Sequence, residues 1–170
     1  KYSWTIEGGT PVGATDQDSG TVRGDTSGAG SVKLAVENAN GCASASPTEK
    51  PVTINELPVP MISGIAEVCR NEEVIYSTQD GHKKYNWTVT GGTIIEGDGT
   101  HEIKIRWTDI TGGTIRLSVT NQNNCTSETL ATKTVVVNEL PAPTISGPTP
   151  VWNNTTIDYS TEAGKNNYYW

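Results

Sequence analysis

The sequence predicts an all-β protein made of tandem units of 83 residues, and two observations carry this prediction. Tryptophans stand at Trp4, Trp87 and Trp170, so the same residue returns twice after 83 residues. Aligning residues 1–87 with residues 84–170 pairs 33 identical residues out of 87 without a gap, and self-similarity at a fixed period indicates a repeat architecture. In addition, apolar residues alternate with polar ones in short runs rich in Ile, Val, Thr, Tyr and Trp, which is typical of β-strands.

A repeated motif divides the chain into units. Asn-Glu-Leu-Pro occurs at residues 55–58 and returns at residues 138–141. If these motifs mark the boundaries, residues 57–139 form the complete unit. Residues 1–56 are then the C-terminal two-thirds of a preceding unit, and residues 140–170 are the first third of a following unit. Because the chain opens and stops near a core tryptophan, we expect it to be part of a longer polypeptide.

Composition and charge exclude several classes of protein. The net charge is −7, whereas a nucleic-acid surface needs clustered Lys and Arg for its phosphate contacts. No stretch of about 18 consecutive apolar residues is present, so no membrane span is predicted in these residues. We therefore expect no nucleic-acid partner and an acidic surface exposed to solvent.

The strand pattern is clearest in residues 57–139. Turn signals recur every 8–12 residues between short alternating runs, which is the spacing of an immunoglobulin-like β-sandwich. The alternation indicates that each sheet has one wet face and one buried face. The expected extended segments are residues 60–62, 73–77, 84–89, 94–95, 103–107, 115–119 and 134–137.

Trp87 is the expected centre of the core, because it shares the apolar face of its strand with Tyr85 and Val89. A stacking platform for a sugar is the less favoured alternative for this tryptophan. Trp107 is expected at the edge of the core or partly exposed, since its equivalent in the first unit is Gly24. The other residues expected around Trp87 are Ile75 or Tyr76, Ile105, Leu117, Val119 and Val136.

A family resemblance follows from these motifs. Residues 85–125 read Tyr-x-Trp-Thr-x-x-Gly-Gly-Thr, then Ile-x-Ile-x-Trp, then Gly-x-Ile-x-Leu-x-Val, then a turn ending in cysteine. Residues 2–42 repeat this pattern with Gly24 at the second tryptophan position. The pattern resembles the PKD-like, immunoglobulin-like repeats of large secreted bacterial surface proteins. Such repeats fill the stalks of giant adhesins, including the gliding-motility adhesins exported by the type IX secretion route, and also serve as spacers beside secreted hydrolases.

The cysteines are expected to have a structural role in such a secreted context. Cys42 and Cys125 are equivalent and lie in the turn before the last strand of a unit, while Cys69 lies just before the second strand. Recurring cysteine positions suggest disulfides. No Cys-x-x-Cys is present, and His82 and His101 show no ligand spacing. We therefore expect no catalytic, cofactor-binding or metal-binding residues.

The pairing of the cysteines has two readings. The first is a Cys69–Cys125 bridge within the complete unit. Greek-key topology would instead place these two turns at opposite ends of the sandwich, roughly 20–25 Å apart, whereas a disulfide needs Cα atoms within about 7 Å. The second reading is a staggered bridge, in which each Cys125-type residue pairs with the Cys69-type residue of the preceding unit. Both readings stay open at the level of sequence.

The junctions and loops complete the predictions. Few residues separate the last strand of one unit from Pro141 of the next, so adjacent units should be held end to end as a rod. A small contact between units is expected at Leu57, Pro58, Leu140 and Pro141.

The acidic loops at residues 16–18 and 96–99 are a weak candidate for calcium, and a solvated loop is the favoured interpretation.

Taken with the resemblance, these features predict a structural protein rather than an enzyme. The expected function is a stalk or filament segment of a bacterial cell-surface adhesin, related to gliding or attachment, at an extracellular location. Its expected partners are neighbouring repeats of the same chain and, through a distal tip, an extracellular surface or polysaccharide. The alternative is a carbohydrate-binding or spacer module of a secreted hydrolase.

Overall fold

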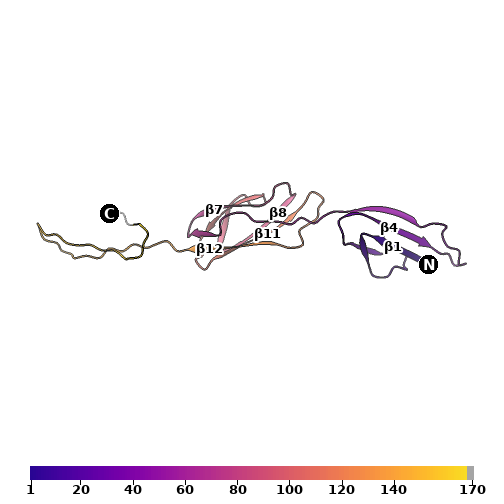
Figure 1. Cartoon of the computed structure of the whole chain (residues 1–170), viewed down its shortest axis with the longest axis horizontal. Coiled ribbons are helices and arrows are strands. Elements are labelled where there is room, and N and C mark those ends of the chain that lie inside the picture. Colours follow the sequence, from indigo (N-terminus) through magenta and orange to yellow (C-terminus); the bar gives the residue numbers. More distant parts are fainter. Residues whose placement is uncertain (168–170) are drawn as a thin grey trace.

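The computed structural model describes residues 1–167, and its regular elements are all β-strands. Figure 1 shows two strand-rich bodies in a row, with a hairpin-like segment extending beyond the second. The chain is an all-β protein with immunoglobulin-like sandwich architecture, as predicted. The first body holds β1 (Tyr2–Glu7), β2 (Gly9–Val12), β3 (Thr21–Gly24), β4 (Gly28–Val36) and β5 (Thr48–Ile54). The second holds β6 (Glu67–Cys69), β7 (Glu73–Ser77), β8 (Lys84–Thr90), β9 (Gly92–Glu96), β10 (Glu102–Trp107), β11 (Gly113–Thr120) and β12 (Ala131–Asn138).

Two sheets form the sandwich of the second body. One sheet has the order β6-β12-β11-β8 and the other has the order β7-β10-β9. The pairs within them are antiparallel except for β6, which lies parallel to β12. The register sets Trp87 opposite Leu117 and Val89 opposite Ile115, so the apolar face of β8 continues across β11. This alternation directs one face of each sheet into a shared core.

The first body repeats this arrangement with fewer strands. Its sheets have the orders β1-β4-β5 and β2-β3. A shift of 83 residues superposes β1 on β8, β4 on β11, β5 on β12, β2 on β9 and β3 on β10. Within residues 1–54 no strand corresponds to β6 or β7, so β5 and β3 each keep one unpaired edge.

Residues 140–167 contain no named strand. An isolated bridge joins Ser146 to Ser160 and is the counterpart of the bridge between Ser63 and Ser77 in the second body. The segment therefore has the local shape of the start of a unit without a sheet against which to pack.

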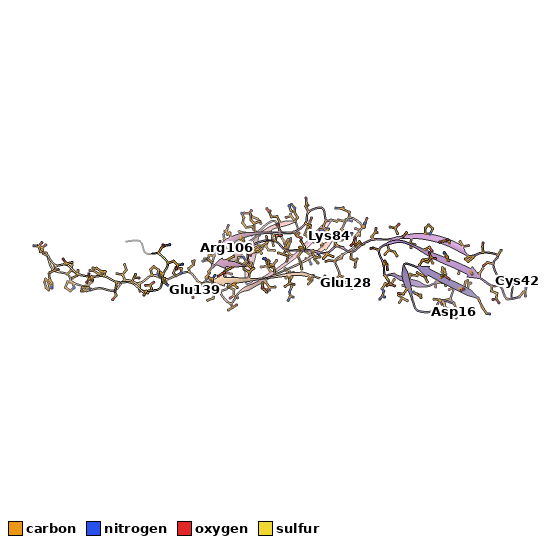
Figure 2. All side chains as sticks on the ribbon, viewed as in Figure 1. Asp16, Cys42, Lys84, Arg106, Glu128 and Glu139 are labelled. Carbon is orange, nitrogen blue, oxygen red and sulfur yellow. The ribbon has the colours of Figure 1, made fainter. Side chains whose placement is uncertain are left out.

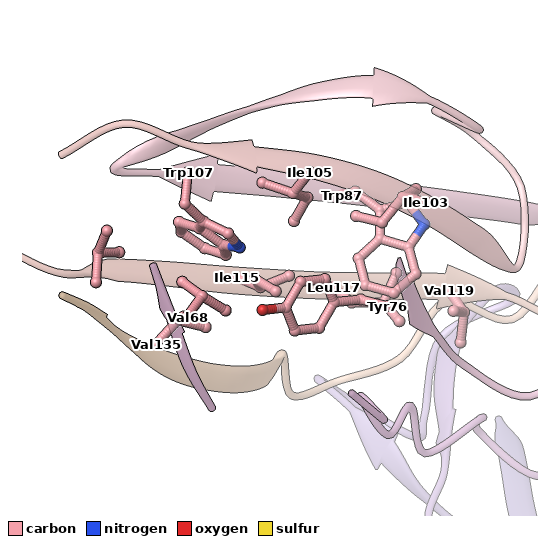
Figure 3. Packing of buried hydrophobic residues seen from close by; sticks show 11 residues of the cluster. Val68, Tyr76, Trp87, Ile103, Ile105, Trp107, Ile115, Leu117, Val119 and Val135 are labelled. Atoms are coloured by element: carbon pink, nitrogen blue, oxygen red, sulfur yellow. The ribbon is translucent and has the colours of Figure 1, made fainter. Parts of the chain in front are cut away.

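The core of the second body lies between its two sheets (Figure 3). Trp87 lies in it as expected, with Tyr76 rather than Ile75 beside it, since Ile75 is 50% exposed. The expectation that Val136 faces the core is wrong, because Val136 is 57% exposed while both of its neighbours are buried. Because residues 135–137 are all valine, the sequence does not show which of them face the core. The register of β12 against β11 decides this. The buried apolar residues are Val68, Tyr76, Trp87, Ile103, Ile105, Trp107, Ile115, Leu117, Val119, Val135 and Val137.

Trp107 is fully buried, with 0% of its surface exposed, and not at the margin of the core as expected from sequence. Its indole lies against the backbone of two glycines. A Cβ atom on Gly113 would stand 2.0 Å from Trp107 Cζ3, and one on Gly92 would stand 2.9 Å from Trp107 Cε3. The absence of side chains at these two positions therefore makes the room that the indole occupies.

Replacing Gly113 by alanine is expected to lower the free energy of unfolding of the second body by about 1–3 kcal/mol, because the added methyl group overpacks the site of Trp107. Urea unfolding followed by circular dichroism measures the change. Gly20→Ala is the matched control, since the nearest atom to a Cβ there is 4.0 Å away. Equal stability of the two variants would contradict the packing seen around Trp107.

Candidate functional site

The repeated tryptophans make the same hydrogen bond in both bodies. The indole N–H of Trp87 donates to the carbonyl oxygen of Thr100 at 2.8 Å, and that of Trp4 donates to the carbonyl oxygen of Gln17 at 2.9 Å. Thr100 and Gln17 are separated by the repeat period of 83 residues. Trp87 is 7% exposed, which leaves no ring face for a sugar, whereas Trp4 is half-buried. The third tryptophan, Trp170, lies outside the described residues.

Two polar atoms in the core have no hydrogen-bond partner. They are the hydroxyl of Tyr76 and the indole nitrogen of Trp107, whose rings meet edge to face with centroids 6.0 Å apart (Figure 3). Burial raises the pKa of Tyr76, and the nearby indole N–H of Trp107 acts in the opposite direction. The pair is enclosed by the core and faces no groove, so its role is packing.

All three cysteines are free thiols. Cys42 and Cys69 are exposed and Cys125 is half-buried. Cys42 lies at the far tip of the first body (Figure 2). No disulfide joins the cysteines of residues 1–167, so the predicted disulfide is not formed within this chain.

The proposed Cys69–Cys125 bridge is wrong, because these residues lie at opposite ends of one sandwich. Cys69 is paired in register with Asn138, the last residue of β12. Cys125 lies in the turn that precedes β12, where its backbone N–H donates to the side-chain oxygen of Asn121 at 3.0 Å. The eight residues of β12 place these ends roughly 25 Å apart.

The first junction is held by the same turn that carries Cys125. The side-chain nitrogen of Asn121 donates to the carbonyl oxygen of Glu56 at 3.0 Å, while its side-chain oxygen accepts the backbone N–H groups of Asn123 and Cys125. One asparagine thus fixes the turn and ties it to the linker from the preceding body. Of the residues expected in a small contact between units, Leu57 is 44% and Leu140 is 49% exposed.

Replacing Asn121 by aspartate is expected to loosen this junction while keeping the turn, because aspartate retains the acceptor oxygen and loses the donor to Glu56. Loss of this hydrogen bond should weaken the contact between the turn and the linker by about 0.5–1.5 kcal/mol. Residual dipolar couplings should show a broader distribution of orientations between the two bodies. Asn123→Asp carries the same change of charge two residues away and should leave that distribution unchanged; equal broadening in both variants would refute the role of Asn121.

The acidic loops do not converge. Glu96 forms an ion pair with Lys104 at 2.7 Å, so a lysine on the neighbouring strand already neutralises its charge. Asp16, Asp18 and Asp98 are exposed. In the part of the chain that the structure describes, no group of three His, Cys, Asp or Glu side chains is gathered as for a metal ion. The same residues include no helix of the length and apolar character needed to cross a membrane.

The two histidines flank one tyrosine, which the sequence did not predict. The ring of Tyr85 lies edge to face with His82 at 5.8 Å and tilted against His101 at 6.4 Å. His101 also stands 3.6 Å from the carboxylate of Asp80. The Tyr85 hydroxyl accepts the backbone N–H of His82 at 3.0 Å. These contacts hold the loop before β8 against the sheet.

The C-terminal segment has one marked electrostatic feature. The carboxylate of Glu162 accepts the backbone N–H of Thr144 at 3.0 Å and its hydroxyl at 2.9 Å. The hydroxyl of Thr161 also donates to this carboxylate, at 2.6 Å. The hydrogen bond from Thr161, followed by backbone bonds and the second hydroxyl, lowers the pKa of Glu162 to about 2. The two arms of the segment are therefore tied together at neutral pH.

The chain was compared with protein-family models, curated proteins and solved structures. Residues 56–135 match the family model of the PKD-like domain, and the immunoglobulin-like sandwich of the second body agrees with that match. No curated protein matches the chain. Among solved structures, domains 4–9 of the surface layer protein SbsC show 14% sequence identity and a TM-score of 0.33. That match covers 94% of this chain and 27% of the other, so this chain spans about a quarter of the length of the matched structure.

Proposed function

We propose that this chain is a structural segment of an extracellular tandem-repeat stalk, whose work is to set distance and to bear tension. The observation that carries the proposal is the arrangement of one unit directly after another (Figure 1). β5 ends at Ile54, and the carbonyl oxygen of Val59 already accepts a hydrogen bond from the side chain of Gln79 in the second body, so the linker is short. The bond from Asn121 to Glu56 further restricts the linker.

The finer proposal follows the family resemblance. Repeats of this type form stalks of bacterial surface adhesins, so we place the chain at the surface of a bacterium, in a filament used for gliding or attachment and exported by the type IX route. In this role the repeats have no catalytic task and need no cofactor. Specificity for a surface or polysaccharide would reside in a distal tip.

Small-angle X-ray scattering combined with a polysaccharide-binding assay tests the proposal. A stalk segment should give the scattering of a stiff rod and retain no polysaccharide. A spacer or binding module of a secreted hydrolase should instead bend freely at Glu56 or bind a polysaccharide with micromolar affinity. Either of these two results would refute the stalk proposal.

A further inference from the structure

Two aspartate–glycine pairs stand in exposed loops of the second body. They are Asp80-Gly81, in the loop before β8, and Asp98-Gly99, in the loop after β9. In such a pair the backbone nitrogen of glycine can attack the side-chain carboxyl of aspartate, because glycine has no side chain to hinder the approach. Both glycines have a positive φ, 87° at Gly81 and 80° at Gly99, and a Cβ atom on either would meet nothing within 4 Å. The two pairs are therefore matched in sequence, backbone shape and steric freedom.

The carboxyl group of Asp80 is folded back onto the amide that would attack it. The backbone N–H of Gly81 donates to Asp80 Oδ1 at 2.7 Å. This contact brings the carboxyl carbon of Asp80 next to the nitrogen of Gly81, and these are the two atoms that join in a succinimide ring. Holding reacting groups in such a geometry removes much of the entropic cost of a reaction. Among the residues that the structure describes, Asp98 has no hydrogen-bond or ion-pair partner.

Two side chains that carry protons stand beside the same carboxyl group. The Tyr85 hydroxyl lies 3.4 Å from Asp80 Oδ1, and His101 Nδ1 lies 3.6 Å from it. The ring of Tyr85 also lies against that of His101, with centroids 6.4 Å apart. When nitrogen attacks a carboxyl group, one oxygen must leave as water. A proton donor in this position can assist that departure, directly or through one water molecule.

The turn itself does not require an aspartate before its glycine. In the next unit the equivalents of Asp80 and Gly81 are Ala163 and Gly164. Gly164 has a positive φ of 84°, close to that of Gly81. The glycine therefore sets the shape of the backbone, and the carboxyl group of Asp80 is an addition to the loop of the second body.

We propose that Asp80-Gly81 is a site of spontaneous backbone modification, at which aspartate isomerises to isoaspartate with His101 as the proton donor. The nitrogen of Gly81 bonds to the carbon of the protonated Asp80 carboxyl group. The hydroxyl of that group takes a proton from His101 and leaves as water, and His101 recovers a proton from the Gly81 nitrogen. Water then adds to the succinimide. Breaking the bond to the side-chain carbon restores aspartate, whereas breaking the bond to the main-chain carbon leaves isoaspartate.

The modification would act on a loop that supports the junction. Isoaspartate adds one methylene carbon to the main chain between residues 80 and 81. The carbonyl oxygen of Gly81 accepts a hydrogen bond from Gln122 Nε2 at 2.9 Å, and Gln122 follows Asn121, which bonds to Glu56 in the linker. The added carbon therefore displaces a contact of the junction turn. This inference goes beyond the proposed function and stands whether or not the chain is a surface stalk.

Incubation of the chain in water labelled with heavy oxygen tests the proposal, because each succinimide that reopens takes one oxygen atom from the solvent whichever product forms. After digestion with trypsin in ordinary water, Asp80 and Asp98 lie in different peptides, which end at Lys83 and Lys104. We expect Asp80 to take up the label at least about 30-fold faster than Asp98 in the folded chain. In urea, which unfolds both loops, the two residues should take up the label at similar rates.

Replacing His101 by glutamine tests the proton donor. His101→Gln should slow labelling of Asp80 by about tenfold and leave that of Asp98 unchanged; the side chain is 48% exposed, so the variant still folds. His82→Gln is the matched control, because His82 contacts the ring of Tyr85 without an ion pair to Asp80, and it should leave both rates unchanged. Equal labelling of Asp80 and Asp98 in the folded chain, an excess at Asp80 that persists in urea, or an unchanged rate in His101→Gln would each overturn the proposal.

Discussion

Replacing Trp107 by alanine is expected to lower the free energy of unfolding of the second body by about 3–5 kcal/mol. The indole is wholly enclosed, and its ring meets Tyr76 edge to face at 6.0 Å. Because Gly92 and Gly113 lie against it with no side chain to move inward, the cavity left by alanine cannot collapse. A loss near the upper end of the range is therefore expected.

Urea unfolding followed by far-ultraviolet circular dichroism measures this loss without relying on the tryptophan that is removed. Trp152→Ala is the matched control, since Trp152 is 75% exposed, and it should change stability by less than about 0.5 kcal/mol. A loss of similar size in both variants would mean that Trp107 does not organise the core.

The first body shows why this effect could not be predicted from the repeat alone. Gly24 stands where the second body has Trp107, and a side chain of another strand lies against it. A Cβ atom on Gly24 would meet Ile54 Cγ2 at 2.9 Å, and the equivalent of Ile54 is the smaller Val137. The extra methylene of Ile54 fills only a small part of the space that an indole would take. A single alignment of two units shows both changes, but not that they share one site.

Alternation with a period of two predicted the long strands of the second body, because one face of each packs on the core. It failed where the pattern is too short or too uniform. β6 has three residues, Glu67–Cys69, and gains its strand character only by pairing with β12. In β12 the three consecutive valines did not indicate which side chains face the core, and Val136 was assigned to the wrong face.

The contacts at the candidate sites were also predictable from the sequence only in part. Sequence left the pairing of Cys69 and Cys125 open, although Greek-key topology already argued against it; the structure places the two residues at opposite ends of the sandwich, as the order of strands requires. The bond from Asn121 to Glu56 was not predicted, since it joins residues 65 positions apart through a side chain typical of any turn. Nor did the spacing of His82 and His101 reveal Tyr85 between them, because that contact forms only when β8 and the loop after β9 meet.

The geometry of the junction favours the staggered disulfide. Cys69 is paired in register with Asn138, whose equivalent in the first body is Asn55. The backbone N–H of Cys125 donates a hydrogen bond to the side chain of Asn121, and that side chain donates one to the carbonyl oxygen of Glu56, the residue after Asn55. By this equivalence, a Cys69-type residue of one unit would lie at the same few linker residues as a Cys125-type residue of the next unit.

A tandem protein of two copies of residues 57–139 reproduces this junction, because residues 138–141 and residues 55–58 have the same sequence. When refolded with oxidised glutathione, it is expected to form a disulfide between Cys69 of the first copy and Cys125 of the second. The bridge closes a loop of roughly 140 residues, and on the chain-entropy model it should stabilise the tandem by about 5 kcal/mol over the reduced form.

Two variants of the tandem protein separate the readings. One keeps only Cys69 of the first copy and Cys125 of the second; after oxidation it should show no free thiol and a higher melting temperature. The other keeps both cysteines of the first copy alone and should retain both thiols, because β12 holds its ends too far apart. If the first variant also retained its thiols, the units would be joined only by their linker, and the bond from Asn121 to Glu56 would remain the main restraint on bending. If it is oxidised as expected, consecutive units are covalently joined on either side of each linker, and tension along the array is carried by two connections at every junction.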